Sequence, residues 1–110
     1  MPQSVLGQFE HQVLLAILRR SSESYSVEIV LELEEQTGRE VATSAVFVAL
    51  RRLESKRLVK GRIVKPGQAG GHARRYFRLT PAALESMRVS RSGYLNLWNG
   101  VESLLDESGS

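Results

Sequence analysis

The sequence lacks the residues and segments on which several common protein functions depend. It contains no cysteine, which excludes disulfides, thiolate nucleophiles and cysteine-ligated zinc. Its two histidines, His11 and His72, are too few and too far apart to predict a metal site or a catalytic triad. The apolar run over residues 13–18 is too short for a signal peptide or a membrane span. We therefore expect a cytoplasmic protein that is not an enzyme and has no cofactor, metal or membrane partner.

Positive charge is concentrated in one quarter of the chain. The 110 residues are enough for one small domain and carry a net charge of +3. Residues 51–78 contain ten basic side chains and one acidic side chain, Glu54, whereas residues 1–50 contain three basic and seven acidic ones. Such a basic segment predicts binding to a polyanion, although charge alone is equally compatible with a solvated surface.

Two segments near the start of the chain have the apolar spacing of helices. In the first, apolar residues recur from Phe9 to Leu18, and the helix is expected to end at residues 19–22. The second is expected to begin with Ser26 as its N-cap and to stop at Gly38. Its inward face is predicted to hold Val27, Val30 and Leu31, and its outward face Glu28, Glu32 and Glu35.

A third helix is predicted to begin at Thr43 or Ser44. Its apolar face carries Val46, Ala49, Leu50 and Leu53. The opposite face carries Ser44, Val48, Arg51 and Ser55, with Phe47 and Arg52 at the flanks. An exposed Val48 and a half-exposed Phe47 among arginines are unusual for a purely solvated surface. We therefore expect this face to contact another molecule.

Two strands are predicted next, over residues 58–64 and 74–79, because β-branched and aromatic residues favour an extended chain. The segment between them, residues 65–73, is rich in glycine and reads as a loop. Strands and loop together make a hairpin whose loop is longer than a tight turn and projects from the molecule. Its basic residues are Lys60, Arg62, Lys65, Arg74, Arg75 and Arg78.

A last helix is expected over residues 80–105. Thr80 and Pro81 form a strong start signal, and Gly93 and Gly100 weaken the helix. Its heptad seam consists of Leu84, Met87, Arg91, Tyr94, Trp98, Val101 and Leu105. Core, dimer interface and ligand cage are the three interpretations of Tyr94 and Trp98. An interface is favoured, because a helix that follows a complete small domain has little core left to enter.

The order of elements, ααα-ββ-α, defines the expected fold. It is a mainly helical winged helix-turn-helix with a small β-hairpin. Residues 1–79 would form the DNA-binding domain, 80–105 the dimerisation helix and 106–110 a frayed tail. In such a domain the third helix enters the major groove, where base edges distinguish all four base pairs, and the hairpin loop contacts the DNA backbone or the minor groove.

The sequence also resembles the PadR family of transcriptional regulators. The resemblance is carried by LGQFE (residues 6–10) followed by VLLAIL (13–18), by VxxSAVFxxLxRLExK (41–56) and by RRYFxLTP (74–81). It implies a dimeric repressor whose C-terminal helix packs on the partner's first helix, and for many members release from DNA by a small-molecule effector. The chain departs from the usual glycine or tyrosine of the family at Ser26, Ser44, Phe47, Arg57 and Ala83. At Arg57, the exit from the third helix, glycine would best tolerate left-handed geometry.

The function predicted from these features is sequence-specific binding of double-stranded DNA at a pseudo-palindromic operator by a homodimer. The expected DNA contacts from the third helix are Thr43, Ser44, Phe47, Val48, Arg51 and Arg52. Those from the hairpin are Lys65, His72, Arg74 and Arg75. The expected dimer contacts are Phe9, Leu84, Met87, Tyr94, Trp98, Val101 and Leu105. Two alternatives remain: a winged-helix module that binds a protein or ligand, and a non-specific architectural DNA binder.

Overall fold

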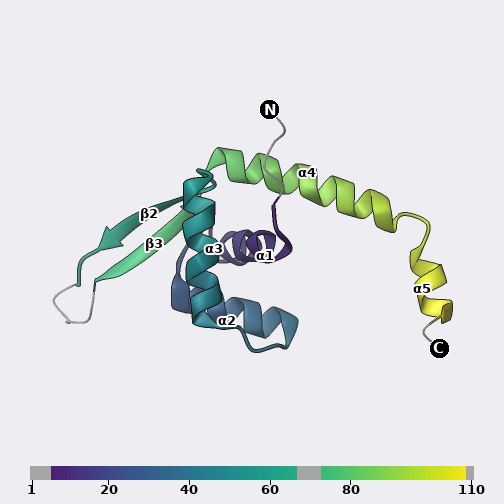
Figure 1. Ribbon diagram of the computed structural model, residues 1–110, viewed down its shortest axis with the longest axis horizontal. Coiled ribbons are helices and arrows are strands. Elements are labelled where there is room, and N and C mark those ends of the chain that lie inside the picture. The colour runs from purple at the N-terminus through teal and green to yellow at the C-terminus, as the bar shows by residue number, and fades with distance from the viewer. Residues whose placement is uncertain (1–5, 67–72, 109–110) are drawn as a thin grey trace.

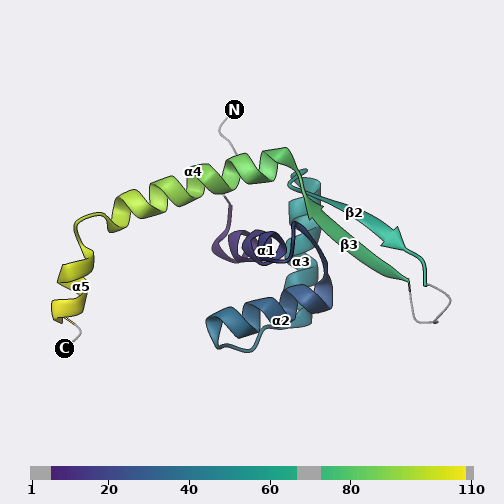
Figure 2. The same cartoon turned by 180° about the vertical axis from the view of Figure 1, so that it is seen from behind.

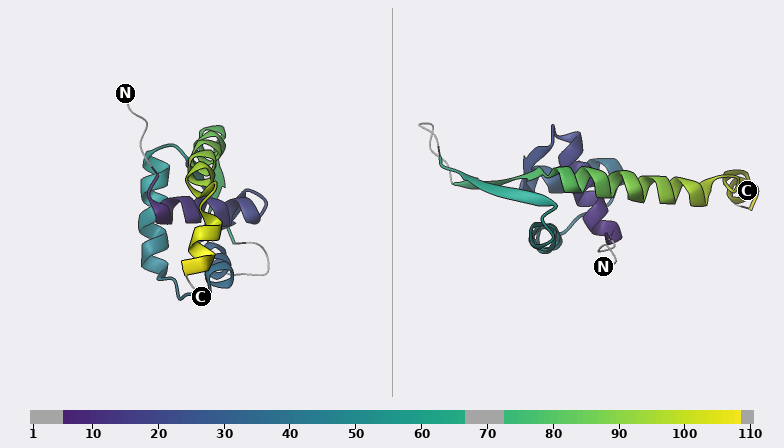
Figure 3. Two further views of the ribbon diagram at one scale, coloured as in Figure 1. Left: turned by 90° about the vertical axis from the view of Figure 1, so that its right-hand side faces the viewer. Right: turned by 90° about the horizontal axis from the view of Figure 1, so that it is seen from above.

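The computed structural model describes residues 6–66 and 73–108. Its elements follow one another as α1 (Gln8–Arg19), β1 (Glu23–Tyr25), α2 (Ser26–Thr37), α3 (Thr43–Ser55), β2 (Val59–Val64), β3 (Arg74–Leu79), α4 (Pro81–Trp98) and α5 (Glu102–Ser108). Helices α1–α3 gather into one body, from which the β2–β3 hairpin and α4 extend on opposite sides (Figure 1). The view from above in Figure 3 shows the same arrangement. The predicted winged helix is therefore confirmed.

One hydrophobic core lies between the three N-terminal helices and the inner face of the sheet. Its buried members are Val13, Leu14, Ala16, Ile17, Ile29, Val30, Leu33, Val46, Ala49, Leu50, Leu53, Leu58, Val59, Phe77, Ala83 and Met87. The predicted inward face of α3 is confirmed in full, since its four residues are at most 4% exposed. Burial of a leucine side chain contributes about 1.5–3 kcal/mol, so this face fixes how α3 is rotated about its axis.

The sheet contains a third strand that the sequence pattern does not predict. β1 pairs antiparallel with β3, so the strand order is β1-β3-β2. β1 has only three residues, with a serine in the middle, so the segment is too short to show the alternation of apolar and polar residues that is typical of a strand. Ser24 is nevertheless fully buried, opposite Phe77. It can occupy this position because its hydroxyl donates a hydrogen bond to Glu28 at 2.9 Å.

Helix α2 turns a different face to the core than the sequence predicts. Of the three residues expected inside, Val30 is buried as predicted, but Val27 and Leu31 are 51% and 53% exposed. Ile29 and Leu33 are buried in their place. Both pairs have helical i, i+4 spacing, so the helix carries two apolar stripes and only packing selects between them. The N-cap is Tyr25 rather than Ser26, and the Tyr25 N–H donates to the Glu28 carboxylate at 3.3 Å. The predicted stop at Gly38 is confirmed by its left-handed φ of 69°.

Glu32 was expected to face solvent but is only 8% exposed. Arg19 and Arg20 at the end of α1 donate to its two carboxylate oxygens at 3.1 and 3.0 Å, and Gln36 donates at 3.0 Å. Three donors compensate for the loss of water around this carboxylate. Glu32 therefore joins α1 to α2.

The turn after α3 requires a left-handed residue, and the chain places Arg57 there with a φ of 62°. The left-handed geometry expected at this helix exit is therefore present. A residue with a Cβ adopts it at a cost of about 1–2 kcal/mol relative to glycine. The Arg57 carbonyl accepts a hydrogen bond from the Thr80 hydroxyl at 2.8 Å, so the turn is fixed to the start of α4. Nearby, Lys56 donates to Glu10 at 2.9 Å and ties the end of α3 to α1.

The C-terminal segment forms two helices rather than one. α4 begins after the Thr80 cap as predicted but ends at Trp98, and Gly100 adopts a positive φ of 86° before α5. Glycine tolerates this conformation, so the weakening predicted at Gly100 is a full break of the helix. Residues 106–108 lie in α5 and are not a frayed tail. Figure 2 shows α4 passing above α1 and then leaving the body.

No helix in the described parts of the chain is long and apolar enough to cross a membrane.

Replacing Glu32 by glutamine should lower the melting temperature at neutral pH. The hydrogen bonds from Gln36, Arg19 and Arg20 hold the Glu32 pKa below its ordinary value of 4.5. A lowered pKa in the folded state means that the stabilisation is present above pH 4.5 and is lost as the pH falls further. The difference between wild type and variant should therefore shrink in thermal melts below pH 4.5. Glu35→Gln, an exposed neighbour, serves as the control; equal shifts for both variants at neutral pH would contradict the assignment.

Candidate nucleic-acid interface

The outward face of α3 is open to solvent along its whole length. Burial of the opposite face places all six predicted contact residues on the surface: Thr43, Ser44, Phe47, Val48, Arg51 and Arg52. Ser44, Val48 and Arg51 follow one another at spacings of four and three and share one side of the helix. Arg51 forms no ion pair with any described residue, so its guanidinium donors are available to a ligand.

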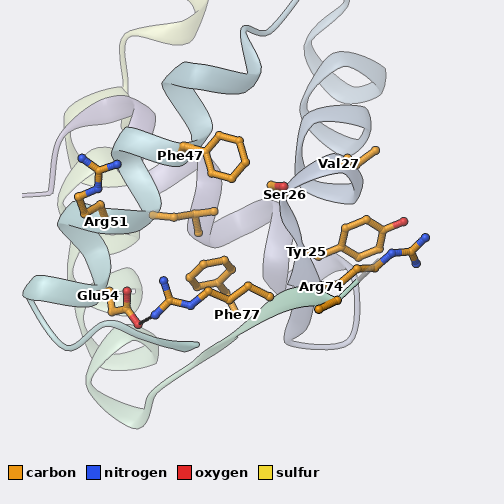
Figure 4. A pocket seen from close by; sticks show the side chains of 11 residues that line it. Tyr25, Ser26, Val27, Phe47, Arg51, Glu54, Arg74 and Phe77 are labelled. Carbon is orange, nitrogen blue, oxygen red and sulfur yellow. Dashed lines mark hydrogen bonds and ion pairs between the residues drawn. The ribbon is translucent and has the colours of Figure 1, made fainter. Parts of the chain in front are cut away.

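A groove of about 550 Å³ lies between α3, the start of α2 and the hairpin. Figure 4 shows Phe47 and Arg51 bordering it from α3 and Arg74 from β3, with residues 25–27 on the far side. The sequence pattern missed Tyr25, Ser26 and Val27 as groove residues. It did so because β1 is not predicted and because Val27 was assigned to the core. The exposed second apolar stripe of α2 is the signal that could have identified Val27.

The hairpin residues predicted to contact DNA have different surroundings. Lys65 is exposed just beyond β2, and Arg74 is exposed at the start of β3. The Arg74 guanidinium lies 4.6 Å from the centre of the Tyr25 ring, a cation–π contact that connects the hairpin to β1. His72 lies outside the described residues. Within those residues, no three potential metal ligands come together.

Arg75, also predicted to contact DNA, has a carboxylate partner on α3. Its Nη2 lies 2.5 Å from Glu54 Oε2, and its guanidinium lies 5.2 Å from the centre of the Phe77 ring. Gly61 on β2 makes room for this pair, since a Cβ at position 61 would lie 2.8 Å from Arg75 Nε. The ion pair therefore connects the hairpin to the third helix, and a larger residue at position 61 would require the Arg75 side chain to shift.

The outer face of the sheet contains a second ion pair. Arg62 of β2 donates two hydrogen bonds to Glu23 of β1, at 2.7 and 2.8 Å, across the intervening strand β3. These bonds lower the pKa of Glu23 and keep it charged. Arg62 also lies 5.7 Å from the ring centre of Tyr76, which contacts Tyr25 edge to face. Arg62 is thus engaged with β1.

Most of the basic segment stays free of carboxylates. Of its ten basic residues, Lys56, Arg62 and Arg75 form ion pairs with described residues. The other seven form none with the described part of the chain: Arg51, Arg52, Arg57, Lys60, Lys65, Arg74 and Arg78. The acidic first half of the chain therefore leaves the surface around α3 and the hairpin positively charged, as a nucleic-acid interface requires.

The residues predicted to form a dimer interface do not lie on one continuous seam. Met87 is 6% exposed and belongs to the core of its own chain, and Phe9 is half-buried against that core. Leu84 and Trp98 are half-buried, whereas Tyr94, Val101 and Leu105 are exposed. The heptad spacing also stops at the break after Trp98.

A second groove, of about 450 Å³, separates α1 from the outer part of α4. Leu15 lines it from α1 and Tyr94 and Leu97 line it from α4. His11 of α1 also lines this groove, and partial burial lowers the pKa of its imidazole. The Tyr94 ring contacts the Trp98 ring edge to face at 6.4 Å.

A winged helix with an exposed third helix, a basic hairpin and a groove between them defines a DNA-binding transcriptional regulator. The model of the transcriptional regulator PadR-like family matches residues 14–88, and the chain belongs to this family. The predicted resemblance is therefore confirmed. So is the prediction that the chain is not an enzyme, because the family consists of regulators.

Solved structures agree with this assignment. A PadR family transcriptional regulator from Eggerthella lenta is 26% identical over 84% of this chain and 80% of its own, with a TM-score of 0.68. A PadR-like regulator from Bacillus cereus, 22% identical, has the same fold over 94% and 97% of the two chains with a TM-score of 0.73. Bacillus subtilis PadR, solved in complex with operator DNA, is 17% identical over 73% and 44%, with a TM-score of 0.61. No curated protein matches the chain.

The Arg75–Glu54 pair should contribute measurably to stability. A double-mutant cycle of Arg75→Ala and Glu54→Ala in urea denaturation is expected to give a coupling of about 0.2–1 kcal/mol, the range for a partly exposed pair. Arg88 and Glu85 on α4 supply the control, because they are 62% and 68% exposed and 3.5 Å apart. Equal coupling in the two cycles would show that the pair does not hold the hairpin on α3.

Proposed function

We propose that the protein is a homodimeric repressor that binds a specific, pseudo-palindromic operator in double-stranded DNA. The observation that carries the proposal is the exposed α3 face centred on Arg51, flanked by Arg52 and Arg74, which form no ion pair with the described residues. A polyanion with a groove wide enough for a helix satisfies both features. The operator complex of the Bacillus subtilis relative supports this choice of ligand.

In the proposed complex, α3 lies in the major groove and the hairpin follows the backbone. Thr43, Ser44, Phe47, Val48, Arg51 and Arg52 would contact bases and nearby phosphates from α3. Lys65, His72, Arg74 and Arg75 would contact phosphates or the minor groove from the hairpin. Arg51 is the residue best placed to donate to the O6 and N7 of guanine. The location we propose is the cytoplasm, where a regulator of this family would meet chromosomal DNA.

The homodimer is proposed from the apolar surface that α4, α5 and the outer side of α1 leave exposed. Its residues are Leu15, Leu18, Tyr94, Leu95, Leu97, Val101, Leu104 and Leu105, each at least 39% exposed. Large apolar side chains exposed on neighbouring helices are typical of a protein–protein contact. We assign Leu84, Tyr94, Trp98, Val101 and Leu105, together with Phe9, to the contact with a second copy. Two α3 helices would then enter successive major grooves about 34 Å apart.

The groove between α1 and α4 is the site we propose for a small-molecule effector. It is bordered by Leu15, Tyr94 and Leu97, and it adjoins the surface assigned to the second copy. A molecule bound there would change how α4 lies against α1. The distance between the two α3 helices would change with it, and a fixed operator spacing would no longer be matched.

Arg51→Ala should weaken binding to the operator by about 1–3 kcal/mol and relax the base preference at one position in each half-site. Arg74→Ala should instead weaken binding to all sequences evenly, because phosphate contacts carry no sequence information. Fluorescence anisotropy with operator and scrambled duplexes separates the two effects. Arg88→Ala on α4, away from the groove, is the control.

Two results would contradict the DNA-binding proposal. Unchanged operator affinity in Arg51→Ala would show that this face of α3 does not read bases. Binding that does not fall steeply as salt concentration rises would favour a protein- or ligand-binding module, because displacement of counterions from phosphates makes DNA binding salt-dependent. Equal affinity for operator and random duplexes would favour an architectural DNA binder.

Trp98→Asp should convert the dimer to a monomer. A buried charge at an apolar interface is strongly unfavourable, and tryptophan commonly dominates such contacts. Light scattering measures the mass, and circular dichroism verifies the fold. Leu31→Asp on α2, at a side chain that is 53% exposed and far from α4, should remain dimeric. An unchanged mass for Trp98→Asp would refute the assigned interface.

A further inference from the structure

Three apolar side chains remain exposed on α3 and at the start of α2, near the groove that Arg51 borders. Phe47 and Val48 of α3 are 49% and 44% exposed, and Val27 at the start of α2 is 51% exposed. Val27, Phe47 and Arg51 line the same groove, as Figure 4 shows. None of the three apolar residues belongs to the core, which α3 fills with four other side chains. Their exposure is therefore not a by-product of folding, and it indicates a surface that another molecule covers.

The charges around this apolar cluster indicate what covers it. Arg51 on α3 and Arg74 on the hairpin border the cluster, and neither forms an ion pair with a described residue. A ligand must therefore combine negative charge at the edges with an apolar centre. The major groove of DNA does so, because phosphates flank it and the C5-methyl group of thymine is the apolar group on its base edges.

The spacing along α3 fits base pairs of the same half-site. Phe47 and Val48 precede Arg51 by four and three residues on one side of the helix. At about 1.5 Å per residue these positions are separated by roughly 4.5–6 Å along the helix axis. Successive base pairs are about 3.4 Å apart, so the apolar residues reach one to two steps from the base that Arg51 contacts.

We propose that Phe47 and Val48 read the C5-methyl groups of thymines within about two base pairs of the guanine contacted by Arg51, and that Val27 reads a thymine methyl of the same half-site from across the groove; this inference rests on the DNA-reading role proposed for α3 above. Arg51 then supplies polar recognition of guanine, and the cluster supplies apolar recognition of thymine. Each half-site contains both bases. Val27 contributes from α2, so recognition is not confined to the third helix.

Deoxyuridine tests this assignment, because it differs from thymidine only by the missing methyl group. The full-length chain first selects duplexes from a random pool. Each thymine in the selected sequence is then replaced by deoxyuridine, and dissociation constants are measured at one salt concentration. Loss of one buried methyl contact is expected to weaken wild-type binding about fourfold, at one or more positions in each half-site.

Three alanine variants connect each methyl group to a side chain. Val27→Ala, Phe47→Ala and Val48→Ala should each abolish the difference between thymidine and deoxyuridine at the position that the removed side chain covers. Their exposed positions make the fold insensitive to these changes, which thermal melts verify. Val89→Ala is the matched control. Val89 is 56% exposed on α4, away from the groove, so this variant should retain the full difference.

Each outcome decides a different point. If wild-type protein binds thymidine and deoxyuridine duplexes equally at every position, methyl recognition is refuted while specific binding stands. If the difference persists in all three variants, the methyl groups are contacted by other residues and the assignment is wrong. If no sequence is selected from the pool, specific DNA recognition itself fails and this inference fails with it.

Discussion

The burial of one side of α3 determines what the rest of the molecule can do. Val46, Ala49, Leu50 and Leu53 pack against α1 and α2, which leaves the helix no freedom to rotate about its axis. Four such side chains contribute several kcal/mol, far more than any exposed ion pair. The direction of Arg51 is therefore set by the hydrophobic core and not by local charge interactions. The result is an exposed face of α3 with a fixed orientation.

Carboxylates hold together the elements that present this helix. Glu32 joins α1 to α2, Glu10 joins α1 to the end of α3, and Glu54 joins α3 to the hairpin. Glu32 engages Arg19 and Arg20, which lie outside the basic segment. Glu10 and Glu54 engage only Lys56 and Arg75 of that segment, so they do not neutralise it as a whole. The surface around α3 and the hairpin keeps its positive charge because these carboxylates form ion pairs that join one element to another.

The sequence predicted the elements whose apolar period is strong and whose ends carry clear signals. The inward face of α3 and the start of α4 after Thr80 are correct in detail. The face of α2 was wrong because Val27 and Leu31 compete with Ile29 and Leu33 at the same spacing. The strand β1 was missed because three residues are too few to show a strand pattern, and only its pairing with β3 makes it a strand. Likewise, no sequence pattern predicts the ion pair between Glu54 and Arg75. These residues lie on different elements and meet only when the hairpin packs on α3, with Gly61 beneath the Arg75 side chain.

The turn at Asn99 and Gly100 has a mechanical consequence. In a straight helix every residue is fixed in angle relative to all the others, at about 100° per position. Because the helix is interrupted here, the direction in which the side chains of α5 point is no longer fixed by the rotation of α4 about its axis. Insertions or deletions beyond Gly100 would consequently leave the orientation of α4 on the body untouched. A change in chain length beyond Gly100 would therefore move the side chains of α5 while α4 keeps its position next to α1.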